Sequence, residues 1–250
     1  AIALECARNL TCDMAELATT ALKSSIECLS GFDKAKAKYV REIEDKTDRL
    51  EDTIGTYLIK LSTKQLNENE GAMASMLLKA IGDFERISDH AVNIIESAEE
   101  MQEKGIVFSE GAEAEMEALS NATTEIVDMS YLSFINEDAE KATLVEPLEQ
   151  VIDRMKELLR TRHIDRLRMS ECSIEAGFVW SDLLTNMERV SDHCSNIAGC
   201  VIDTKKQNMN LHKSLKNFRS DSPVYREKYT EDNRKNSQRR GKNLKKFILA

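Results

Sequence analysis

The stretch LKAIGDFERISDHAVNII at residues 78–95 returns as SDLLTNMERVSDHCSNIA at residues 181–198. The two match as E-R-[I/V]-S-D-H-x-x-N-I at an offset of 103 residues. A second segment, REIEDKTDRL at 41–50, is answered by EPLEQVIDRM at 146–155 at an offset of 105. Two segments that recur in the same order with nearly the same shift indicate a duplicated unit. The residues copied most faithfully form a Glu-x-x-x-Asp pair and not an apolar core pattern. This indicates the carboxylates as candidate functional residues.

The composition is typical of an all-helical protein. The 250 residues include two prolines and nine glycines, with 5% aromatic and 32% charged residues. Long helices that expose one polar face to water produce such a composition. No run of 18 apolar residues occurs, so we predict no membrane-spanning helix. The chain begins with Ala and without a signal-peptide pattern, and we interpret it as a fragment or a processed product.

Charge is distributed unevenly along the chain. Residues 205–250 contain 14 Lys and Arg and 4 Asp and Glu, which leaves 21 and 40 in residues 1–204. The basic tail is either a solvated extension or an anchor, because Lys and Arg near an anionic membrane surface each gain about 1 kcal/mol. Nucleic acid is not an expected partner, because the acidic body would repel its phosphates.

The six cysteines are spaced singly along the predicted helices, and none forms a C-x-x-C pair. A zinc ribbon and a thioredoxin-type site are therefore not supported. We expect reduced thiols in a cytoplasmic compartment.

Apolar residues at i, i+3, i+4 and i+7 predict six helices. Their ranges are 2–30, 33–62, 68–103, 109–135, 138–168 and 172–206. Three helices in each copy predict an all-α fold of two tandem antiparallel three-helix bundles.

We assign residues 1–104 to the first bundle, 105–206 to the second, and 207–250 to a basic, partly disordered tail. Pro147 lies inside the fifth predicted helix, so we expect a kink there or a later helix start.

Each copy carries two Glu-x-x-x-Asp pairs, and both members of a pair lie on one helix face because successive residues turn by about 100°. All four pairs point away from the apolar stripe. They converge in a groove or splay apart, depending on the handedness of the bundle. Converging carboxylates repel one another and need cations or protons. Oxygen-rich clusters suit iron, magnesium, manganese or calcium. The candidate metal ligands are Glu44, Asp48, Glu85, Asp89, Glu149, Asp153, Glu188 and Asp192.

Other residues near the pairs receive different predictions. Asn93 and Asn196 are candidates for additional carbonyl ligands. Glu96 of the first copy corresponds to Gly199 in the second copy, so the two sites should differ in charge or nuclearity. His90 and His193 point about 100° away from the preceding Asp, and we expect them to bond a neighbouring helix and not a metal.

The sequence shows no set of residues that is typical of a catalytic site. A di-iron enzyme of the ferritin type would need Glu-x-x-His on one face, which neither copy supplies. No Ser/His/Asp or Cys/His set and no phosphate-binding glycine loop is evident. We therefore do not expect an enzyme.

The tandem motif and its partner pairs resemble the PhoU family over residues 5–206. The resemblance implies two three-helix bundles whose carboxylate motifs bind surface metal clusters, commonly iron, in some members. We accordingly expect divalent or trivalent metal ions, iron first, with zinc, manganese or magnesium as alternatives.

Within this family the chain is most similar to the PhoU-like domain that ends bacterial Na+/phosphate cotransporters. The opening AIALECARNL at 1–10 resembles their junction after the last membrane segment, and the run from Phe218 through Tyr229 resembles their C-terminal end. Residues 230–250 depart from that pattern, as does Pro147.

We interpret the chain as the cytoplasmic, metal-binding regulatory domain of a sodium-dependent phosphate transporter, at the inner face of the cell membrane. Its expected partners are the transporter membrane domain or the phosphate-uptake machinery, an anionic membrane surface through the basic tail, and a second copy in a homo-oligomer. The alternative is a free-standing PhoU-type negative regulator of phosphate uptake. A third hypothesis is an inert helical scaffold with acidic, soluble faces.

Overall fold

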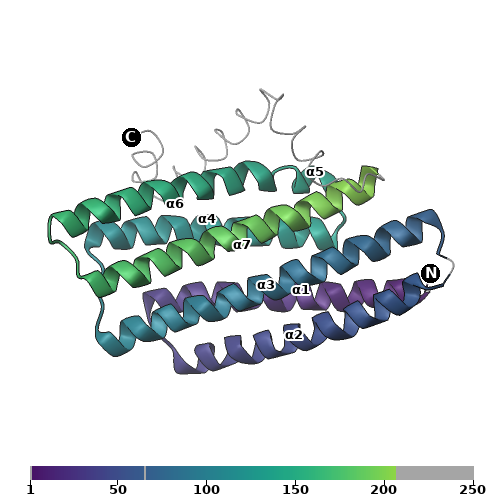
Figure 1. The fold of residues 1–250 in the computed structure, drawn as a ribbon, viewed down its shortest axis with the longest axis horizontal. Coiled ribbons are helices and arrows are strands. Elements are labelled where there is room, and N and C mark those ends of the chain that lie inside the picture. The colour runs from purple at the N-terminus through teal and green to yellow at the C-terminus, as the bar shows by residue number, and fades with distance from the viewer. Residues whose placement is uncertain (1, 65, 207–250) are drawn as a thin grey trace. The chain divides into compact units, whose positions relative to one another are not determined.

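The computed structural model describes residues 2–64 and 66–206, and this part of the chain is built from helices (Figure 1). The helices are α1 (Ile2–Ser30), α2 (Lys34–Ser62), α3 (Glu68–Lys104), α4 (Glu110–Ile135), α5 (Ala139–Ala142), α6 (Val145–Arg168) and α7 (Ile174–Lys206). The all-α prediction is confirmed, and the predicted ranges agree within two residues except at the fifth helix.

The fifth predicted helix is divided at residues 143–144 into α5 and α6. Asp138 caps α5 as expected, because its Oδ1 accepts a hydrogen bond from the Lys141 N–H at 3.0 Å. Pro147 is the third residue of α6. The first N–H groups of a helix have no partner within the helix, so proline loses no hydrogen bond there. Of the two expectations for Pro147, the later helix start is therefore correct.

Side-chain and backbone caps set the ends of α2 and α3. Asp33 begins α2 by accepting a hydrogen bond from the Ala35 N–H at 2.8 Å. Asn67 and Glu70 form a reciprocal capping box at the start of α3. Gly105 ends α3 with a φ of 62°, a left-handed conformation that favours glycine. This turn leads into the linker to the second bundle.

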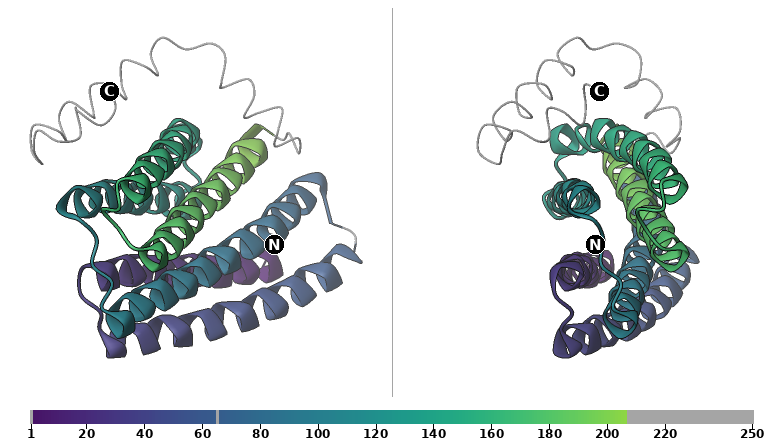
Figure 2. Two further views of the ribbon diagram at one scale, coloured as in Figure 1. Left: turned by 60° about the vertical axis from the view of Figure 1, so that its left-hand side comes forward. Right: turned by 90° about the vertical axis from the view of Figure 1, so that its left-hand side faces the viewer.

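The helices form two three-helix bundles, as predicted (Figure 2). Helices α1, α2 and α3 pack against one another, and α4, α6 and α7 do the same, with the short α5 beside α4 and α7. The bundles meet mainly where α3 packs against α7, and also where α1 packs against α4. Lys23 of α1 forms an ion pair with Asp128 of α4 at 3.0 Å. The seven helices therefore belong to one compact unit.

The apolar core continues from one bundle to the other. Phe84 of α3 packs edge-to-face against Phe134 of α4, with ring centroids 5.1 Å apart. Aliphatic side chains fill the space between the helices of each bundle. The largest fully buried side chains include Trp180, Phe84, Met14, Leu22, Ile54, Leu58, Leu77, Ile87, Ile94, Ile95, Leu119 and Ile126.

Two further predictions from composition can be compared with the structure. All six cysteines are free thiols, as expected. None of the described helices is both long and apolar enough to cross a membrane. The predicted basic tail at 207–250 lies outside the described residues.

Replacing Phe84 with Ala should lower the free energy of unfolding by about 3–5 kcal/mol, because it removes a buried ring and leaves a cavity between the bundles. Chemical denaturation measures this change. Phe178 is 67% exposed on α7 and is the matched control. Phe178→Ala should change stability by less than about 0.5 kcal/mol. Equal losses for both variants would contradict the assignment of Phe84 to the core.

Candidate functional site

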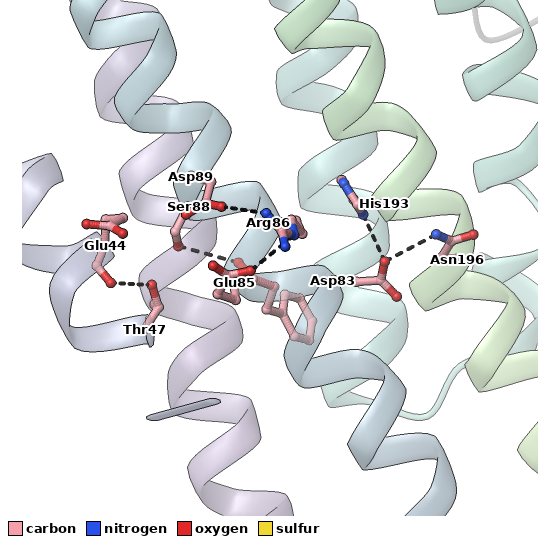
Figure 3. A network of polar contacts seen from close by, with 10 residues as sticks. Glu44, Thr47, Asp83, Glu85, Arg86, Ser88, Asp89, His193 and Asn196 are labelled. Carbon is pink, nitrogen blue, oxygen red and sulfur yellow. Dashed lines mark hydrogen bonds and ion pairs between the residues drawn. The ribbon is translucent and has the colours of Figure 1, made fainter. Parts of the chain in front are cut away.

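The carboxylates of the first copy come together along α2 and α3. Glu44 and Asp48 lie on α2, and Glu85 and Asp89 lie on α3. Figure 3 shows Glu44, Glu85 and Asp89. A groove of about 710 Å³ lies next to them. Its charged lining residues are Asp48, Glu51, Asp83, Glu85, Lys79 and Arg86, and α7 contributes Asn196 and Cys200. The glutamates are half-buried and Asp48 is exposed, so the prediction that these pairs lie outside the core is confirmed.

Burial and charge repulsion raise the pKa values of three glutamates in this region. The pKa of Glu85 is raised to about 7, first because burial disfavours its charged form and then because Asp89 is close. The pKa of Glu44 is also raised, by burial and then by Asp89 on the opposite helix. The pKa of Glu51 is raised by burial and by its acidic neighbours. Carboxylates from two helices therefore share one electrostatic environment.

Arg86 offsets part of this negative charge. Its Nη1 lies 3.1 Å from the Asp89 carboxylate, and its Nε lies 3.5 Å from that of Glu85. The Arg86 side chain is 61% exposed. Exposed ion pairs are strongly screened and contribute little. Lys79 also lines the groove, so two cations face the carboxylates of Glu44, Asp48 and their neighbours, which remain in excess.

The second copy differs at one decisive position. Glu149 and Asp153 lie on α6, and Glu188 and Asp192 lie on α7. Here the Nζ of Lys156 lies 3.0 Å from the Glu188 carboxylate, with both side chains largely buried. The second copy thus carries its own cation next to its carboxylates.

The offset of 105 residues aligns Lys156 with Glu51. The same position therefore holds a carboxylate, Glu51, in the first copy and an ammonium, Lys156, in the second. The pKa of Asp192 is raised, first by burial and then by Glu188, and the charges of Arg189, His193 and Lys156 offset part of this rise. The expectation that the two sites differ in charge is met, through this position and not through Glu96 and Gly199.

Within residues 2–64 and 66–206, no three His, Cys, Asp or Glu side chains already stand in an arrangement that could hold a metal ion. The carboxylates of the first copy are near enough to repel one another but do not form a closed ligand shell. The metal assignment of the eight residues therefore stays a prediction. The donor set nevertheless has the chemistry that a cation needs, since a positive ion would relieve the repulsion that raises the pKa of Glu85.

The remaining polar residues of the motif join the two bundles. His90 Nδ1 lies 2.8 Å from the Asn186 Oδ1. His193 Nδ1 lies 2.9 Å from the Asp83 Oδ1, as Figure 3 shows. The offset of 103 aligns Asp83 with Asn186 as well as His90 with His193. The two contacts are therefore equivalent and related by the duplication, and the histidine rings lie 5.6 Å apart between them.

The asparagines of the motif take part in the same interface. The Asn93 amide donates to Asn186 at 3.0 Å, and the Asn196 amide donates to Asp83 at 3.2 Å. These contacts use the amide nitrogens, so the assignment of both asparagine carbonyls as additional ligands stays a prediction. The prediction that the histidines bond a neighbouring helix is confirmed. Asp83 and Asn186 were missed, although their alignment at the repeat offset could have found them.

Comparison with known proteins agrees with this architecture. The PhoU domain model matches residues 11–98 and 116–201, which is both copies of the repeat. The chain belongs to the PhoU family. Its relatives include a phosphate-specific transport system accessory protein PhoU homolog 1 from Thermotoga maritima. This relative is 28% identical, and the match covers 74% of this chain and 80% of the relative. A PhoU homolog from Pseudomonas aeruginosa is 25% identical over 80% of this chain and 82% of its own length.

Solved PhoU structures share the fold. PhoU from Pseudomonas aeruginosa superposes with a TM-score of 0.78 and 22% identity, over 83% of this chain and 99% of that structure. The regulatory protein PhoU from Streptococcus pneumoniae gives a TM-score of 0.72, with 16% identity over 82% and 96% of the two chains.

The PhoU relatives are named as accessory proteins, and the matches cover most of their length. These findings favour the free-standing PhoU-type regulator, our alternative, over the cotransporter domain that was our main interpretation.

In metal-free, chelator-treated protein, the free energy of unfolding should fall by on the order of 2 kcal/mol between pH 5 and pH 8. The folded chain holds the Glu85 proton up to a pKa of about 7, whereas the unfolded chain loses it near 4.5. Stability is therefore lost as the pH rises through this window. Urea denaturation at several pH values measures the slope, and Glu85→Gln should flatten it. Glu117→Gln, at an exposed glutamate of α4, is the control and should keep the slope.

Proposed function

We propose that this chain is a PhoU-type accessory regulator of phosphate uptake that acts by binding and not by catalysis. The observation that carries the proposal is the match of the PhoU domain to both copies of the repeat. The names of the relatives, which describe accessory proteins of a phosphate-specific transport system, support it. Its partner would be the phosphate-uptake machinery at the inner face of the cell membrane.

We further propose that the first-copy groove holds a metal ion. Glu44, Asp48, Glu85 and Asp89 would supply the oxygen ligands. Asp48 and Glu85 line the groove itself, and Glu51 adds a further carboxylate there. A bound ion would supply positive charge that neutralises these side chains. Iron is the first candidate, with zinc, manganese and magnesium as alternatives, because carboxylate oxygens suit hard and intermediate cations.

The second-copy carboxylates should bind a metal more weakly. Lys156 already neutralises Glu188 at 3.0 Å, so a metal ion would have to compete with a built-in ammonium. This asymmetry makes the first bundle the metal-dependent half of the proposed regulator. Neutralising the α2–α3 face would change the surface that the chain offers to its partner.

Lys156→Glu should increase metal binding, because it gives the second copy the carboxylate that Glu51 provides in the first. We expect about one additional ion per chain on this ground. Elemental analysis after equilibration with Fe²⁺ or Mn²⁺ measures the stoichiometry. Arg160→Glu makes the same charge change at an exposed residue of α6 and should leave the stoichiometry unchanged. An equal increase for both variants would show that net charge alone, and not the groove, decides binding.

Expression of the chain in a bacterium that lacks its own PhoU should restore repression of phosphate uptake in phosphate-rich medium. The double variant Glu85→Gln/Asp89→Asn should lose most of this repression, because it removes the central carboxylates of the groove. Uptake of labelled phosphate gives the readout, with Glu117→Gln as the control. Full repression by the double variant would contradict the role of the groove. A lack of repression by the folded wild-type chain would contradict the regulatory function in that host.

A further inference from the structure

A second polar group lies in the second bundle, near the turn between α6 and α7. Glu115 of α4 accepts an ion pair from Arg166 of α6 at 2.9 Å and one from Arg162 at 3.3 Å. The Arg166 guanidinium lies over the ring of Trp180 from α7, 5.1 Å from its centroid. The His163 ring stacks on the same indole at 5.7 Å. We call these five residues the Arg–Trp cluster.

Most of the cluster is buried, and several of its hydrogen-bond donors have no partner. Trp180 is 1% exposed and His163 is 7% exposed. Among the residues that the structure describes, none forms a hydrogen bond with the Trp180 Nε1, the His163 Nε2, or the Nε and Nη2 of Arg166. Buried polar atoms without partners destabilise a fold, so each such group calls for an explanation.

The first copy shows that the fold does not require this cluster. At the repeat offsets of 105 and 103, His163, Arg166 and Trp180 align with the leucines Leu58, Leu61 and Leu77. All three leucines are buried in the first bundle. The same architecture is therefore stable with an aliphatic core at these positions. Burying an ion pair in their place opposes folding, which indicates a purpose other than packing.

A glycine accommodates the cluster on α7. A Cβ atom at Gly177 would approach the His163 Nε2 to 3.0 Å, closer than such contacts usually come. The corresponding residue of the first copy is Ala74, which is buried. Glycine weakens a helix relative to alanine. Glycine in place of alanine at this position thus leaves room for a histidine that the first copy does not have.

The unused groups are donors. Trp180 Nε1 and the Arg166 nitrogens can only donate hydrogen bonds, and the His163 Nε2 donates in one of its tautomers. A single water oxygen accepts two hydrogen bonds, fewer than this set offers, whereas a tetrahedral oxyanion presents four acceptor oxygens. Guanidinium groups bind such anions through paired N–H donors. Glu115 holds Arg166 in position from the opposite side.

We propose that the Arg–Trp cluster is a binding site for a small tetrahedral oxyanion. Arg166 would carry the charge, Trp180 and His163 would donate further hydrogen bonds, and Glu115 would orient the guanidinium. The site lies in the second bundle and uses none of the carboxylate pairs. It therefore goes beyond the metal-dependent regulation proposed above, and only the choice of inorganic phosphate as the first probe rests on that function.

Calorimetric titration of chelator-treated protein with inorganic phosphate tests the site. One saturable event per chain is expected, and Arg166→Gln should weaken it at least tenfold. The triple variant His163→Leu/Arg166→Leu/Trp180→Leu recreates the packing of the first copy, so it should fold and lose binding. Arg168→Gln, at an exposed arginine of the same helix, is the control and should stay within twofold of the wild type. Glu85→Gln/Asp89→Asn should also bind normally, which separates this site from the metal groove.

Nuclear magnetic resonance of His163 supplies a second readout. Burial and the charge of Arg166 lower the pKa of this imidazole in the free protein. A bound anion favours the protonated ring, so saturating phosphate should raise the His163 pKa by about one unit. The same shift should be absent in Arg166→Gln. A phosphate that bound elsewhere on the chain would leave the His163 titration unchanged.

Sulfate and vesicles that contain phosphatidic acid form the comparison arms. Binding of sulfate but not phosphate would support the oxyanion site and contradict its link to phosphate supply. Binding to vesicles alone would overturn the proposal, because buried donors cannot reach a headgroup at a bilayer surface. Failure of both phosphate and sulfate to bind at millimolar concentration would also overturn it, as would binding that Arg166→Gln leaves intact.

Discussion

The structure depends on α3, a helix that serves two interfaces at once. Glu85 and Asp89 face α2, where their charges meet those of Glu44 and its neighbours. One residue further along, His90 turns by about 100° and faces α7. A single short motif therefore supplies both the carboxylate group of one bundle and the contact with the other. Any change that moves α3 relative to α7 would also move the carboxylates against α2.

Duplication gave the two bundles one framework and allowed them to diverge inside it. The interface keeps its equivalence, since His90 with Asn186 mirrors His193 with Asp83. The carboxylate groups of the two copies are not equivalent, because Lys156 supplies a cation in the second copy. The cores also differ, with three leucines in one bundle and the Arg–Trp cluster in the other. Each copy thus acts as a reference that shows which polar residues the fold can do without.

Much of the fold could be predicted from the sequence, because helices follow local signals. Apolar periodicity placed five of the six predicted helices within two residues, and Pro147 marked the later start of α6. The exposure of the carboxylate pairs also followed from the 100° turn. Packing between the bundles could not be predicted this way, because it depends on which helix faces meet in three dimensions. For that reason Asp83 and Asn186 were missed. Lys156 was missed because its contact with Glu188 depends on how α6 and α7 face each other within the second bundle.

The α2–α3 carboxylates repel one another, and we propose that a bound cation relieves this repulsion. The most direct measurement is a crystal structure of protein equilibrated with Fe²⁺ or Mn²⁺, with anomalous scattering recorded at the edge of the metal. We predict an anomalous peak among the first-copy carboxylates, bound by oxygens from Glu44, Glu85 and Asp89. A structure from saturated crystals with no peak between α2 and α3, and with these carboxylates splayed apart, would contradict this prediction.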